Sequence, residues 1–167
     1  MVENPETGAL EPFDFNYLQD NVPELRLLGC DISSVEFSPP LDSSAITTEH
    51  WVQLARVIEE HYEDYDGFVI LHGTDTMAYT ASAMSFVFEG LSKPIVFTGS
   101  QLPVGRLRTD GKENLITALE IAAARDAHGC PRVPEVALFF ENYLMRGNRT
   151  SKISADQFHA FESYNYP

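Results

Sequence analysis

The stretch of sequence that decides the fold spans residues 67–77 and reads GFVILHGTDTM. It joins a continuous apolar run, Phe68 to Leu71, to a loop of small polar residues, and an Ala-rich segment from Met77 to Leu91 follows. A continuous apolar run of this length is typical of a strand that is buried on both faces, as in a parallel sheet. The stretch therefore predicts a buried strand, a polar loop and a helix in succession.

Two later apolar runs, residues 94–97 and 134–140, repeat the pattern of a buried strand. Apolar residues at helical spacing predict helices at 47–62 and 114–126, the first of them capped by Thr47. Strands that alternate with helices over crossovers of about twenty residues or more predict parallel pairing through βαβ units. The predicted fold class is α/β, a three-layer α/β/α sandwich with a mainly parallel sheet.

The N-terminal region carries weaker patterns. Phe15, Leu18 and Val22 lie at near-helical spacing and predict a short helix. The run from Cys30 to Phe37 alternates enough apolar residues to predict a strand, which the prolines at 39 and 40 would end. These two elements would precede the helix at 47–62.

Length and charge exclude several classes of protein. The 167 residues (18.7 kDa) suffice for one domain with a hydrophobic core, and 44% of them are hydrophobic. Eleven Lys and Arg stand against 25 Asp and Glu, a formal net charge of −14. This balance disfavours binding to nucleic acid or to an anionic membrane, whose phosphates attract cations. No apolar run reaches the about 18 residues of a membrane span, and the opening is unlike a secretory signal, so we expect a cytoplasmic protein.

Metal and cofactor motifs are also missing from the sequence. Cys30 and Cys130 stand a hundred positions apart, and we expect two reduced, mostly buried thiols. The five histidines lack zinc-site spacing, and there is no G-x-G-x-x-G, G-x-x-x-x-G-K-[ST] or G-x-S-x-G. We therefore expect no metal and no cofactor. Acid–base chemistry would have to come from carboxylates, hydroxyls or a lysine.

Polar clusters follow the predicted strands and should meet at one edge of the sheet, where α/β folds bind ligands. They are Asp42-Ser43-Ser44, Gly73-Thr74-Asp75-Thr76, Thr98-Gly99-Ser100-Gln101 and the segment after Phe140. Ser, Thr and Asp are also the preferred helix N-caps, which is the more common role for Ser43, Ser100 or Thr76 taken singly. The run from Thr74 to Thr76 supplies two hydroxyls and a carboxylate, more than one cap requires.

A threonine hydroxyl needs a base to take its proton, and a lysine can serve as that base if burial lowers its pKa. The basic residues after the third predicted strand are Arg146, Arg149 and Lys152. Each would by default be a solvated surface charge. Composition and spacing do not choose among them.

Three segments together resemble the N-terminal domain of bacterial-type L-asparaginases, most of all the cytoplasmic type I branch. They are GFVILHGTDTM (67–77), KPIVFTGSQ (93–101) and DGKENL (110–115). The resemblance runs along the whole chain. It implies hydrolysis of the side-chain amide of L-asparagine to L-aspartate and ammonia through a threonine acyl-enzyme. It also implies a homodimer or homotetramer.

The resemblance implies a role for each matching residue. Thr74, Asp75 and Lys152 match the family's catalytic Thr-Asp-Lys set. Lys152 would be the base, Thr74 would position or deprotonate the attacking water, and Asp75 would orient the lysine and bind the substrate ammonium. The substrate-binding residues would be Asp42, Ser43, Ser44, Asp75 and Ser100, with the serines at 43 and 44 on the carboxylate and the carbonyl of Ser100 toward the amide.

The chain also departs from the family. Family members begin with a strand ending in Thr-Gly-Gly-Thr, whose first threonine is the nucleophile, and residues 1–167 contain no such motif. Nothing in them matches the smaller C-terminal domain. The resemblance therefore implies that residues 1–167 are an N-terminal catalytic domain that is incomplete at its N-terminus, has no C-terminal domain and is inactive by itself.

Two alternatives remain open. Asparagine and glutamine differ by one methylene, which a pocket distinguishes by only about 1–3 kcal/mol, so a glutaminase or an amidotransferase-associated amidase fits the same residues. A catalytically inactive module that binds an amino acid fits them as well.

Overall fold

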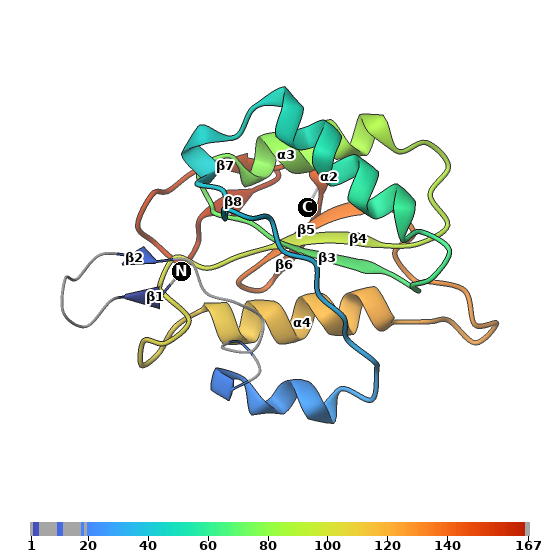
Figure 1. The fold of residues 1–167 in the computed structure, drawn as a ribbon, viewed down its shortest axis with the longest axis horizontal. Coiled ribbons are helices and arrows are strands. Elements are labelled where there is room, and N and C mark those ends of the chain that lie inside the picture. The colour runs from blue at the N-terminus through green and yellow to red at the C-terminus, as the bar shows by residue number, and fades with distance from the viewer. Residues whose placement is uncertain (1, 4–9, 12–17, 19, 166–167) are drawn as a thin grey trace.

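A four-stranded sheet forms the centre of the structure, a computed structural model that describes residues 2–3, 10–11, 18 and 20–165 (Figure 1). The strand order is β3-β4-β5-β6. The first three strands are parallel, and β6 runs antiparallel to β5. The three predicted strands and their parallel pairing are confirmed, and β4 and β5 are buried along their whole length. The strands of this sheet are β3 (Phe68–Leu71), β4 (Ile95–Thr98), β5 (Val136–Phe140) and β6 (Tyr143–Arg146).

Helices cover both faces of the sheet, which confirms the three-layer α/β/α architecture. Helices α2 and α3 lie on one face and α4 lies on the other (Figure 1). The α-helices are α2 (Thr48–Glu60), α3 (Met77–Val87) and α4 (Gly111–Ala123), and the short 3-10 helices are η1 (Pro23–Leu27), η2 (Ser43–Ala45) and η3 (Gly147–Arg149).

Two small antiparallel pairs complete the strands. The pair formed by β1 (Val2–Glu3) and β2 (Leu10–Glu11) belongs to the N-terminal region. The pair formed by β7 (Ser151–Lys152) and β8 (Phe161–Glu162) follows the main sheet. Strand β7 thus places Lys152 on a paired backbone instead of a free loop.

Alternate side chains of β4 belong to different cores, as a sheet covered on both faces requires. Ile95 and Phe97 pack in the cluster formed with α2 and α3, whereas Val96 packs with Ala118 and Ala122 of α4. All three β4 side chains are fully buried. Because both faces of the central strands are dry, polar chemistry is confined to the loops at the sheet edges.

The predicted strand at Cys30–Phe37 is wrong. These residues form irregular backbone, and Val35 is 60% exposed. Alternating apolar residues make a strand only beside a partner, and within the described residues β3 pairs only with β4. The same position explains why β3 is less buried than predicted: it is an edge strand of the described sheet, and Leu71 is 47% exposed.

Strand β6 was not predicted, because the turn before it lacks the usual signal. Residues 141 and 142 connect β5 to β6, and Glu141 adopts a left-handed φ of 58°. Hairpin turns with such angles usually contain glycine. Here the side-chain oxygen of Asn114 accepts the Glu141 backbone N–H at 2.9 Å, which helps to offset a strain of about 1–3 kcal/mol.

Two other predictions concern the N-terminal helix and the cysteines. The predicted helix falls partly on residues 13–17 and 19, which lie outside the described residues; η1 follows it, and Leu18, Val22 and Leu25 are buried against α4.

Both cysteines are free, but Cys130 is exposed, so the expectation that both are mostly buried is wrong for it. Its backbone N–H donates to Asp126 in a surface turn.

Candidate active site

The loop after β3 is held tightly between two other loops. The His72 backbone N–H donates to the Thr98 carbonyl at 2.9 Å, which extends the β3–β4 ladder past the strand end. A Cβ on Gly73 would collide with the Ser43 hydroxyl, and one on Gly99 would collide with the carbonyl oxygen of His72. Only glycine permits this approach, so residues 43, 73 and 99 bring the three loops together.

The centre of the candidate site is Lys152. Its Nζ donates to Thr74 Oγ1 and to Asp75 Oδ1, both at 2.9 Å. The Lys152 side chain is 17% exposed and that of Asp75 is 60% exposed. An ion pair with one partner so well solvated stabilises the fold by at most about 1 kcal/mol. The arrangement therefore contributes little to stability, and its hydroxyl and its carboxylate both lie within hydrogen-bond distance of Lys152 Nζ.

Gln101 completes this cluster, and the sequence prediction missed it as a site residue. Thr74 Oγ1 donates to Gln101 Oε1 at 3.1 Å, and Gln101 Nε2 donates to the Gln157 carbonyl at 2.9 Å. The only signal in the sequence is its position after Ser100, in the polar segment that ends a buried strand.

The Asp42-Ser43-Ser44 segment divides between two roles. Ser43 is buried; its hydroxyl donates to Asp75 Oδ2 at 3.4 Å, and its carbonyl accepts from Thr76 Oγ1 at 2.6 Å. Asp42 is exposed and accepts from both the backbone N–H and the hydroxyl of Ser44, which holds the pKa of its carboxyl below the usual value. The structure thus joins Ser43 to the cluster, while Asp42 and Ser44 contact each other.

Ser100 lies on the same loop as Gln101. Its side chain lies against Gly111, where an added Cβ would come within 2.9 Å of the Ser100 Cβ. Asn114 Nδ2 donates to the Gly99 carbonyl at 2.9 Å, and Asp110 accepts the Gln101 backbone N–H. The first turn of α4 therefore fixes the loop that carries Ser100 and Gln101.

A second network lies on the other side of the Gly73–Thr76 loop, around the buried Thr80, with Trp51 and His72 half-buried. Trp51 Nε1 donates to Thr80 Oγ1 at 3.1 Å, and His72 contacts Thr80 Oγ1 through Nε2 and the Gly73 carbonyl through Nδ1. The Gly73 carbonyl can only accept, so His72 carries a proton on Nδ1; in the neutral ring Nε2 then accepts from the Thr80 hydroxyl. Burial lowers the pKa of His72, against the opposing effect of the bond to Gly73, and so favours this neutral form.

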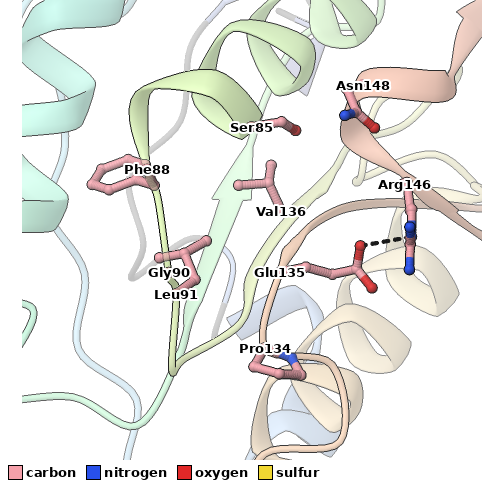
Figure 2. Close-up of a pocket in the computed structure, with 9 residues that line it drawn as sticks. All are labelled: Ser85, Phe88, Gly90, Leu91, Pro134, Glu135, Val136, Arg146 and Asn148. Carbon is pink, nitrogen blue, oxygen red and sulfur yellow. Dashed lines mark ion pairs between the residues drawn. The ribbon is translucent and has the colours of Figure 1, made fainter.

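Two surface depressions lie at opposite ends of the parallel strands. An open one of about 280 Å³ is lined by Lys152 and the next three residues. Figure 2 shows the other, of about 320 Å³, which is lined by residues of α3, β5 and β6 and by the Arg146–Glu135 ion pair. Arg146 lies opposite Ala137, near the start of β5, so this second depression is at the amino end of that strand. Thr74 follows the carboxyl end of β3, at the other end of the parallel strands.

The described residues contain neither a metal-binding cluster nor a membrane-spanning helix. In the part of the chain that the structure describes, no group of three His, Cys, Asp or Glu side chains is arranged to hold a metal ion. Within the same residues, no helix combines the length and the apolar character needed to cross a membrane.

Comparisons with known proteins identify the family. The family model described as "Asparaginase, N-terminal" matches residues 1–167. L-asparaginase 1 of Escherichia coli K12 is 55% identical over 137 residues, which are 82% of this chain and 39% of that protein. A mouse protein named 60 kDa lysophospholipase is 47% identical over 156 residues, 93% of this chain and 26% of that one.

The fold comparison agrees. The crystal structure of L-asparaginase I from Vibrio cholerae superimposes with a TM-score of 0.87 at 45% identity, over 99% of this chain and 49% of that chain. The chain thus spans about half of this structure and a smaller share of the two sequence relatives. These findings confirm the resemblance that the three sequence segments indicated. The chain belongs to the asparaginase family and matches its N-terminal domain.

Proposed function

We propose that these residues form the larger part of the catalytic domain of an amidohydrolase, which converts L-asparagine to L-aspartate and ammonia. The observation that carries the proposal is the contact of Lys152 Nζ with both Thr74 Oγ1 and Asp75 Oδ1 at 2.9 Å. An amine, a hydroxyl and a carboxylate in such contact can pass a proton among them, and the carboxylate can also bind a cationic group of the substrate.

In the proposed reaction a threonine hydroxyl attacks the side-chain amide carbon of the substrate. Lys152 takes the proton of that hydroxyl and passes it to the departing nitrogen as the C–N bond breaks, so that ammonia leaves; water then hydrolyses the acyl-enzyme to release aspartate. Lys152 acts as the base in its neutral form, and Thr74 positions the attacking water or passes its proton to the lysine. The attacking threonine would come from a Thr-Gly-Gly-Thr strand outside residues 1–167, and the unpaired edge of β3 in the described sheet supports a position beside Thr74.

The substrate is a zwitterion and needs groups of both signs. Asp75 would bind the ammonium, and its exposure leaves room for this contact. Ser43 would bind the carboxylate, with Ser44 and Asp42 shaping the same loop. The Ser100 carbonyl would face the amide nitrogen.

The proposal extends to the setting of the protein, by resemblance to the type I branch. We propose a cytoplasmic enzyme that assembles into a homodimer or a homotetramer. Residues 1–167 alone would be inactive, since they contain no Thr-Gly-Gly-Thr motif and no C-terminal domain.

The test is an assay of ammonia release from L-asparagine and from L-glutamine. It compares residues 1–167 with the same residues fused to the flanking segments of E. coli L-asparaginase 1, which at 55% identity is a suitable donor. We expect the fusion to be active, with a preference for asparagine, and residues 1–167 to be inactive. A preference for glutamine would favour the amidotransferase-associated alternative.

Two further outcomes would reject the proposal. Calorimetric binding of L-aspartate by the fusion without any ammonia release would indicate an inactive binding module. Release of fatty acid from a lysophospholipid without amidase activity would indicate the activity in the name of the mouse relative.

A further inference from the structure

We infer that Gln101 is a positioning residue for the proposed reaction. Its side-chain amide fixes the hydroxyl of Thr74 so that one lone pair faces Lys152 and the other stays open to an incoming hydroxyl or water. The inference rests on the proposed function, since it concerns how Thr74 takes part in proton transfer.

The two contacts of the Gln101 amide determine its orientation. The Gln157 carbonyl can only accept, so the group facing it at 2.9 Å must be the Gln101 NH₂. The amide oxygen therefore faces Thr74 Oγ1 at 3.1 Å. The reversed amide would place two carbonyl oxygens against each other and leave the Thr74 proton without this acceptor.

This orientation determines the direction of the Thr74 proton. A threonine hydroxyl has one proton and two lone pairs. The proton is donated to Gln101 Oε1, and one lone pair accepts from Lys152 Nζ at 2.9 Å. The second lone pair remains for the proton of an attacking hydroxyl or water.

An amide oxygen is too weak a base to take the proton from Thr74. The proton can reach a neutral Lys152 only after the hydroxyl turns away from Gln101. Gln101 therefore controls where the hydroxyl points before the reaction, and Lys152 remains the final acceptor.

The backbone of Gln101 is itself held firmly. Both carboxylate oxygens of Asp110 accept its N–H, at 2.9 and 3.1 Å, and one of them also accepts the Leu102 N–H at 3.0 Å. The Gln157 carbonyl belongs to the segment that follows Lys152 between β7 and β8. Gln101 thus joins the loop that carries Thr74 to the segment that carries Lys152.

The test uses Gln101→Met and Gln101→Glu in the active fusion protein or the full-length enzyme. Methionine has a similar length but no acceptor, and glutamate keeps an acceptor for Thr74 while losing the donor to Gln157. We expect Gln101→Met to lower kcat about 10–100-fold with KM changed less than about threefold, because Asp75 and Ser43 are untouched. Gln101→Glu should recover only part of that loss, because it restores the acceptor for Thr74 but sets a carboxylate oxygen against the Gln157 carbonyl. The matched control is Gln53→Met on the exposed side of α2, which should leave kcat unchanged.

A second measurement does not depend on turnover. The three-bond coupling between the Thr74 hydroxyl proton and Hβ, measured by NMR, reports the rotamer of the Thr74 O–H bond. We expect one rotamer in the wild type and in Gln101→Glu, and averaging in Gln101→Met. This result decides the role of Gln101 in orienting Thr74 even if the protein has no amidase activity, so the two proposals fail separately.

Two results would overturn the inference. One is a single, unchanged Thr74 rotamer in Gln101→Met, whether or not the unfolding temperature falls, which would make Gln101 a purely structural link. The other is an active enzyme in which Gln101→Met keeps kcat within twofold of the wild type.

Discussion

The loop at residues 72–76 contacts two hydrogen-bonded clusters that differ in burial and charge. On one side Thr74 and Asp75 meet Lys152, and the Asp75 side chain is 60% exposed. On the other side His72 meets Thr80, which is 1% exposed and also accepts from Trp51. The charged cluster faces solvent, whereas the buried cluster consists of neutral groups.

The difference in burial distinguishes the contacts that hold the loop in place from the contacts of the residues proposed to react. Leaving a buried polar group without its partner costs about 1–3 kcal/mol, so the His72–Thr80 cluster resists change. A solvated ion pair contributes at most about 1 kcal/mol, so the Lys152–Asp75 contact can be exchanged for contacts to a substrate. The side around Thr80 therefore holds the loop, and the exposed side carries the residues proposed for the chemistry.

The largest expected effect comes from Lys152→Met on the exposed side. Loss of the base should lower kcat about 10²–10⁴-fold, while the free energy of unfolding changes by at most about 1 kcal/mol. Ammonia release and thermal unfolding measure the two effects. Lys112→Met, which removes a lysine paired with Glu24 at the surface, is the control and should keep kcat. Full activity of Lys152→Met would reject the base role.

The next effect is on the buried side. Thr80→Val removes the hydroxyl that serves both Trp51 and His72, and should lower the free energy of unfolding by about 1–3 kcal/mol. Denaturant unfolding measures the change. Thr48→Val, the same substitution at an exposed position of α2, should change stability by less than about 0.5 kcal/mol. Equal effects of the two substitutions would contradict the holding role of this cluster.

A smaller effect distinguishes Ser43 from its neighbour Ser44. Ser43→Ala removes the hydroxyl that reaches Asp75 and should raise KM for L-asparagine about tenfold, equivalent to about 1.4 kcal/mol. Ser44→Ala removes a hydroxyl that contacts Asp42 and should change KM less than about threefold. Steady-state kinetics of the two variants compare them directly. The reverse order would assign the substrate carboxylate to Ser44.

The smallest effect is a pH dependence of stability. The pKa of His72 is lowered in the folded protein, so the unfolded chain binds more protons as the pH falls below about 6.5. Stability should therefore fall toward acid pH, by at most about 1.4 kcal/mol per pH unit from this group. Unfolding at pH 7.5 and 5.5 measures it. His72→Asn should flatten the dependence of the free energy of unfolding on pH. His128→Gln, at an exposed site, should leave it unchanged. Equal slopes in the wild type and both variants would exclude His72 as the cause.

The sheet illustrates how far local pattern predicts the fold. The three parallel strands were predictable because Val96, Leu138 and their neighbours are apolar without interruption, which only burial on both faces explains. The hairpin to β6 was not, because its turn depends on Glu141 in a strained conformation that the Asn114 side chain stabilises from another element. Cys30–Phe37 has the pattern of a strand but no strand partner among the described residues.

The candidate site shows the same limit. Thr74 and Asp75 were predictable from their place after a buried strand, but Lys152, 78 residues beyond Thr74, was selected only by resemblance to a family. Gln101 was missed as a site residue because its role depends on which way its amide points. A backbone carbonyl at residue 157 decides that orientation, and no residue type in the sequence encodes it.

The sequence by itself determined the order of the three parallel strands and the helices between them, and the end of those strands at which polar loops collect. These properties follow from hydrophobic periodicity, which acts over a few neighbouring residues. Only the tertiary structure decided which hydroxyl donates to which acceptor around Lys152 and which histidine has its pKa lowered by burial. Those contacts join residues far apart in the chain, and hydrogen bonds depend on differences of a few tenths of an ångström that only the packed fold sets.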